Sequence, residues 1–117
     1  MVSYMILLIP MIEIDVYETA AGERPFEKWF ARVDRHARKR ILIAFGKLED
    51  GNTGSLKSVG GGVSEIKIPF GEGYRIYLGR EGDRLVILLY GGTKKRQSAD
   101  IAKAKQLWRD YLAEKQH

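Results

Sequence analysis

The sequence contains no cysteine. This absence excludes disulfide bonds, thiol nucleophiles and thiolate metal sites, and it fits a reducing compartment, so we expect a cytoplasmic protein. Histidine is scarce as well. The chain has two, of which His36 lies among arginines and His117 is the last residue. No pair of histidines is therefore placed for acid–base catalysis, and no group of carboxylates or histidines has metal-ligand spacing. We expect no catalytic metal and no other cofactor.

Long hydrophobic runs are also lacking. The apolar run at residues 5–9 is far shorter than the ~20 residues of a transmembrane helix. No Lys or Arg precedes it and no small-residue cleavage site follows it, so we predict neither a signal peptide nor a membrane anchor. A cleaner strand pattern begins at Met11. Residues 1–10 are thus either an extension that lengthens an edge strand or an over-called start, and residues 11–117 form the domain.

The composition of the chain is that of an ordinary globular domain with a net positive charge. The chain has 117 residues, of which 44% are hydrophobic and 30% charged, enough for one core. The net charge of +5 suggests a polyanionic partner, usually nucleic acid or an anionic membrane surface, although many basic domains bind neither. We expect no membrane partner.

Hydrophobic periodicity predicts an α+β domain in the order β-α-α-β-β-β-α, with a twisted, mainly antiparallel sheet and helices packed on one face. Pro25 suits the first turn of a helix, and Ser98 is a good N-cap for the last helix. The expected elements are a strand at 12–17, helices from 25 and over 34–49, a loop at 56–62, a hairpin, an apolar central strand at 85–90 that ends at Gly91-Gly92, and the last helix.

The expected pairing of the two hairpin strands places two cations side by side. If the turn at residues 69–73 joins antiparallel strands, the alternation of side chains places Lys67 opposite Arg75. Both would lie on the face away from the core, flanked by Glu65 and Tyr77. Like charges in this position cost about 0.2–1 kcal/mol, so an external phosphate is expected to compensate them. The alternative is that Glu65 neutralises one of them and the pair is an ordinary surface feature.

Five segments carry a family resemblance: PFEKWF (25–30), GGGVSEIKI (60–68), GEGYRIYLGR (71–80), VILLYGGTK (86–94) and QSADIAKAK (97–105). In this order they resemble the RelE/ParE toxin superfamily and, within it, the phage-derived Gp49-like branch of addiction module killer proteins (HigB-like). The resemblance covers about residues 11–112. The chain departs from the branch at Thr93, where an acidic residue is usual, and at Lys95 and Arg96, where small hydroxyl residues are usual; Lys94 matches.

The resemblance implies a RelE-like fold and the toxin of a type II toxin–antitoxin system, which cleaves mRNA in the ribosomal A site and inhibits protein synthesis. Its partner would be a small helix-turn-helix antitoxin, and operator DNA would be bound only through that partner. Metal-free cleavage needs a base for the 2′-hydroxyl, an acid for the 5′-oxygen and a cation for the phosphorane. The candidate catalytic residues are Arg75, Lys67, Lys94, Tyr77 and Glu65, and the candidate RNA-binding residues are Lys95, Arg96, Arg38, Lys39 and Lys57.

Within this assignment, the Arg75 guanidinium would hold the phosphate charge and the Tyr77 ring could stack an unpaired base. Two other functions stay open. ParE-like members of the superfamily poison DNA gyrase, and the basic cluster at Lys67, Arg75 and Lys94 argues against that target. A non-catalytic module that binds only RNA or its antitoxin is favoured by the missing histidines and the altered loop. The cations at 35–40 form either a solubilising helix face or a ribosomal RNA contact.

Overall fold

The computed structural model describes residues 11–116, so the choice between an extension and an over-called start at residues 1–10 lies outside it. Its five strands form one sheet in the order β1-β5-β4-β3-β2, and only β1 runs parallel to its neighbour. No helix in this part of the chain has both the length and the apolar character needed to cross a membrane. The elements are β1 (Glu13–Val16), α2 (Pro25–Phe30), α3 (Arg35–Glu49), β2 (Lys57–Gly60), β3 (Val63–Ile68), β4 (Tyr74–Glu81), β5 (Leu85–Thr93), the 3-10 turn η1 (Lys94–Arg96) and α4 (Gln97–Lys115).

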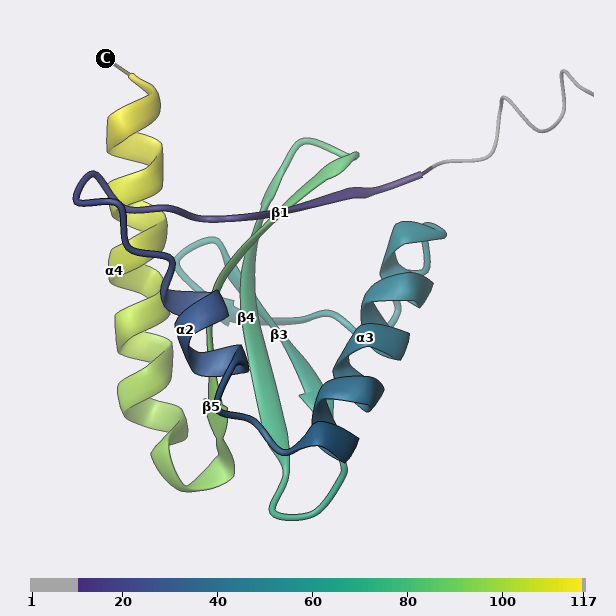
Figure 1. Cartoon of the computed structure of the whole chain (residues 1–117). Helices are drawn as coiled ribbons and strands as arrows, with labels where there is room; N and C mark the ends of the chain where they lie inside the picture. Colours follow the sequence, from purple (N-terminus) through teal and green to yellow (C-terminus); the bar gives the residue numbers. More distant parts are fainter. Residues whose placement is uncertain (1–10, 117) are drawn as a thin grey trace, which may run out of the picture.

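The helices cover both faces of this sheet. On one face, α2 and α3 pack against a core that includes Ile76 and Leu78, and on the other α4 packs against Tyr77 and Leu89. Figure 1 shows α3 and α4 on opposite sides of the strands. The α+β class is confirmed, but the prediction of helices on one face only is wrong. The middle strands bury both sets of alternating side chains, which one layer of helices cannot achieve.

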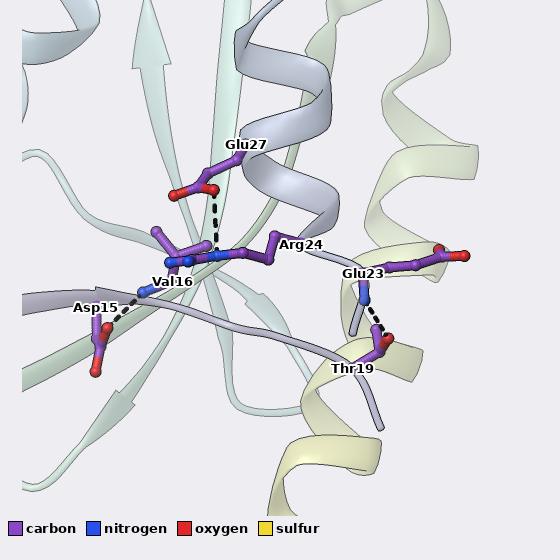
Figure 2. Close-up of polar contacts among 6 residues, drawn as sticks. All are labelled: Asp15, Val16, Thr19, Glu23, Arg24 and Glu27. Atoms are coloured by element: carbon purple, nitrogen blue, oxygen red, sulfur yellow. Dashed lines mark hydrogen bonds and ion pairs between the residues drawn. The ribbon is translucent and has the colours of Figure 1, made fainter. Parts of the chain in front are cut away.

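Local signals account for the starts of the first two helices. Pro25 occupies the first turn of α2, where its missing N–H costs nothing. Before it, the Glu23 N–H donates to Thr19 Oγ1 at 3.1 Å, and Arg24 pairs with Glu27 at 3.1 Å (Figure 2). Asp34 caps α3, because its carboxylate accepts hydrogen bonds from the first free backbone amides of the helix.

Three predicted boundaries are wrong. The segment 56–62 is not wholly a loop, because Lys57–Gly60 forms the edge strand β2, which is short and mostly exposed and so shows no alternation. The central strand does not end at Gly91-Gly92 but continues to Thr93. Ser98 is not an N-cap, because η1 leads directly into α4 at Gln97.

Both glycines of β5 are explained by a bulge. The register of β4 and β5 shifts between Tyr77 and Leu78, which turns the following residues of β5 to the opposite faces. Gly91 then lies against the ring of Trp29 from α2, and Gly92 lies against the carboxylate of Asp100 from α4. A β-carbon on either glycine would overlap these side chains, so the pair permits close approach of helices from both sides.

Candidate functional site

The predicted hairpin register is confirmed. Lys67 pairs with Arg75, and Glu65 pairs with Tyr77, across β3 and β4. Arg75 in turn pairs with Gly92 on β5. Since paired residues point to the same face, Lys67, Arg75 and Gly92 form one row across three strands, on the side that α4 covers.

The predicted exposure of this face is wrong. Arg75 is only 6% exposed, Glu65 5% and Tyr77 0%, because the first turns of α4 cover them. Lys67 alone of the four is exposed, at the outer end of the row. Periodicity within β3 and β4 correctly groups these side chains but carries no information about the element that covers them. The Tyr77 ring is therefore not placed to stack a base.

The covered side chains form a buried polar cluster, which we define as Glu65, Arg75, Tyr77, Gln97 and Asp100. Arg75 Nε lies 3.5 Å from Glu65 Oε2, and Gln97 Nε2 donates to the same oxygen at 2.9 Å. Glu65 thus neutralises Arg75, as the alternative predicted, but this ion pair is buried and is not an ordinary surface feature. In the described chain, the buried side-chain atoms that lack a hydrogen-bond partner all belong to this cluster: Arg75 Nε and Nη1, Tyr77 Oη and Asp100 Oδ2.

Burial sets the protonation of this cluster. Desolvation, together with the nearby negative charges of Glu65 and Asp100, raises the pKa of Tyr77 well above its usual range. Burial also raises the pKa of Asp100, and the nearby positive charge of Arg96 partly offsets this increase. Tyr77 therefore stays protonated near neutral pH and is poorly suited to act as a general base.

The exposed cations gather at the end of the sheet where β5 leaves it. Lys94, Lys95 and Arg96 form η1 and are all exposed. Lys67 lies two strands away from Gly92, which at the usual strand spacing is about 10 Å. We call Lys67, Lys94, Lys95 and Arg96 the cationic edge. It combines two predicted catalytic lysines with two predicted RNA-binding residues.

The other predicted RNA-binding residues lie away from η1. Lys57 is exposed on β2 and pairs with Glu65, so it lies one strand from β3 and diagonally across from Lys67. Arg38 and Lys39 belong to α3, which packs on the other face. Only Lys39 of the two is exposed. The ten candidate residues thus lie at the cationic edge with its buried cluster, on the outer strand and on α3, and Lys67 and Lys39 face one groove between β3 and α3.

Sequence reasoning missed a groove between α3 and β3. It has a volume of about 910 Å³ and is lined by one stripe of α3, by the end of β3 and by the loop before β2. The missed signal is a second helical stripe beside the core stripe, at positions i, i+3, i+4, i+7, i+8 and i+11. These residues are His36, Lys39, Arg40, Ile43, Ala44 and Lys47.

Comparison with known proteins identifies the family. A model of the family described as "Phage derived protein Gp49-like" matches residues 28–109, which include the cationic edge, the buried cluster and the groove. An uncharacterized protein of Haemophilus influenzae is 41% identical over 83 residues, which are 70% of this chain and 84% of that protein. The match thus extends over most of the α+β domain. The chain belongs to the family of phage-derived Gp49-like proteins.

Proposed function

We propose that this protein is the toxin of a type II toxin–antitoxin system and that it cleaves mRNA during translation without a metal ion. Membership of a phage-derived family supports the toxin assignment, because the resemblance places the addiction module killer proteins in that branch. The observation that carries the RNA target is the cationic edge. Three exposed cations on η1 and a fourth on β3, two strands away, form a surface that suits a phosphate backbone.

The proposed chemistry is attack of the 2′-oxygen on the adjacent phosphorus. The 2′-hydroxyl proton passes to a base, the P–O5′ bond breaks, and the 5′-oxygen receives a proton, which leaves a 2′,3′-cyclic phosphate. Lys67 and Lys94 are the exposed candidates for proton transfer, with Lys95 and Arg96 holding the phosphate. The ribosome would supply the positioning, which is worth up to about 7–11 kcal/mol of a barrier.

Arg75 takes a different role in this proposal from the one that the sequence suggests. Its guanidinium pairs with Glu65 inside the protein and does not reach solvent freely. It acts as a positioning residue, since it lies between Lys67 on β3 and Gly92 on β5, two residues before η1. Glu65 and Tyr77 belong to the same buried polar cluster, and in this proposal they do not touch RNA.

A non-catalytic RNA- or antitoxin-binding module is the second candidate. It is favoured by the burial of Arg75, Glu65 and Tyr77, three of the five predicted catalytic residues. A ParE-like gyrase poison has less support, because the exposed part of the basic cluster suits RNA. The proposed nuclease and the non-catalytic binding module differ in whether a phosphodiester bond is broken.

Primer extension on a reporter mRNA in a reconstituted translation system tests the proposal. The wild-type protein should produce ribosome-dependent cuts, and Lys67→Ala and Lys94→Ala should each reduce them by about 10²-fold or more. Lys28→Ala, an exposed cation on α2, is the matched control and should cut normally. Cuts that persist in a Lys67→Ala/Lys94→Ala protein would overturn the site, and absence of cuts with the folded wild type would leave the binding module.

A further inference from the structure

The groove beside α3 has an open strand edge and an exposed aliphatic side chain, and neither takes part in the proposed cleavage chemistry. We infer that it binds an extended, acidic segment of a partner polypeptide, which adds a strand to the free edge of β3. If the proposed function holds, that segment belongs to the antitoxin. The groove lies between α3 and β3 and shares only Lys67 with the cationic edge, so variants of α3 can test the inference without any measurement of RNA cleavage.

The edge of β3 is open where the groove begins. β2 pairs with β3 only as far as Glu65, and beyond it no described residue pairs with Ile66–Ile68 on that side. Residues 66–69 all line the groove. Because the side chains of consecutive residues in a strand point to opposite faces, a groove that touches all of them runs along the edge of the strand. At that edge, backbone N–H and C=O groups can pair with another strand.

The floor of the groove is apolar. Ile43 of α3 is 55% exposed, and it faces Ile68 and Phe70 across the opening together with Ala44. An exposed aliphatic side chain beside an open strand edge suits the alternating apolar residues of an incoming strand. The length also fits, because the α3 stripe from His36 to Lys47 extends about 16 Å, which is the span of about five extended residues.

The charge of the groove selects an acidic partner. Lys39, Arg40, Lys47 and Lys67 all line it, and no described lining residue is acidic. RNA phosphates would also satisfy these cations. The groove offers less for the stacking of bases, because the Arg40 guanidinium already lies over the Phe70 ring, 4.8 Å from its centroid. Open backbone and an apolar floor favour a polypeptide.

The full chain provides a matched pair of variants for the test. Leu42 and Ile43 are neighbours on α3, each 55% exposed, but only Ile43 lines the groove. The probe is a fluorescein-labelled seven-residue peptide of alternating Glu and Ile, followed by fluorescence polarisation. Ile43→Glu should weaken binding about tenfold or more, because it removes a buried aliphatic contact, whereas Leu42→Glu should change it by no more than about twofold.

Two further measurements complete the experiment. In the peptide complex, amide hydrogen exchange should slow at Ile66–Ile68, and a peptide with proline at its centre should bind weakly because it cannot complete the strand pairing. Equal effects of Ile43→Glu and Leu42→Glu, or unchanged exchange at β3, would overturn the inference. So would a labelled oligouridine that binds in an Ile43-dependent manner when the peptide does not. Ile43→Glu should retain mRNA cleavage, so failure here and failure of the proposed function are separate results.

Discussion

Gln97 donates a hydrogen bond of 2.9 Å to the same Glu65 oxygen that lies 3.5 Å from Arg75 Nε. One carboxylate thus joins the first turn of α4 to the two hairpin strands. All three side chains sit where the helix meets η1, next to the exposed lysines. The placement of the cationic edge therefore depends on a buried ion pair, and this dependence can be measured as stability.

Arg75→Met should destabilise the protein by about 3–5 kcal/mol, because it leaves the Glu65 carboxylate buried without its cation. Urea denaturation at neutral pH measures the loss. The double variant Glu65→Gln/Arg75→Met removes both charges and should recover more than half of it. If the two substitutions instead add their losses, the pair does not stabilise the fold as argued here.

Gly92→Ala should destabilise the protein by about 1–3 kcal/mol, because the added methyl group overlaps the Asp100 carboxylate. Asp100→Ala in the same chain should relieve part of this cost. Gly46→Ala is the contrasting control: no atom outside its own helix lies within 4 Å of the new methyl, so the variant should gain about 0.5–1 kcal/mol in helix propensity. Thermal unfolding of the four proteins is the measurement. A Gly92→Ala protein as stable as wild type would contradict the close approach.

Asp100→Asn should stabilise the protein increasingly as the pH rises. Burial raises the pKa of Asp100 in the folded state above its ordinary value of 3.8. The folded state then holds the proton more tightly than the unfolded state, so ionisation above that pH costs stability. The difference in unfolding free energy between variant and wild type should be smallest at or below pH 3.8 and should grow toward neutral pH. A constant difference across this range would contradict a buried, ionising Asp100.

Removal of charge from η1 should weaken RNA binding in a salt-dependent manner. For a single-stranded RNA, each lost phosphate contact reduces the slope of log K against log salt by about 0.7. Lys94→Ala and Lys95→Ala should each produce such a change, measured by filter binding at several salt concentrations. Lys28→Ala and Lys103→Ala, both exposed outside the cationic edge, should leave the slope unchanged. Equal slopes in all four variants would exclude η1 as an RNA contact.

The sequence predicted most of the elements and the register of the hairpin, because turn residues and alternation are local signals. Lys67 lies opposite Arg75 as expected. It did not predict what covers that row, since the stripe on α4 that packs there is compatible with either face of the sheet. β2 was missed for a related reason, because an exposed edge strand has no buried side to show alternation.

The glycines of β5 illustrate the same limit. In the sequence, Gly91-Gly92 looks like the end of a strand, because glycine lacks a side chain to pack. In the structure, the absence of a side chain is what allows Trp29 and Asp100 to approach. The groove was missed because the cations at 35–40 suggested a solubilising helix face or a ribosomal RNA contact, and because the open edge of β3 depends on where β2 begins.

The parallel pairing of β1 with β5 has a consequence for synthesis. The first described strand leaves the ribosome long before Leu85–Leu88, with which Glu13–Val16 pairs, and α4 follows later still. Contacts so distant along the chain form slowly, and they cannot form until the late segment has emerged. The nascent chain therefore cannot complete its sheet until β5 has emerged, and it cannot cover the polar cluster until α4 follows.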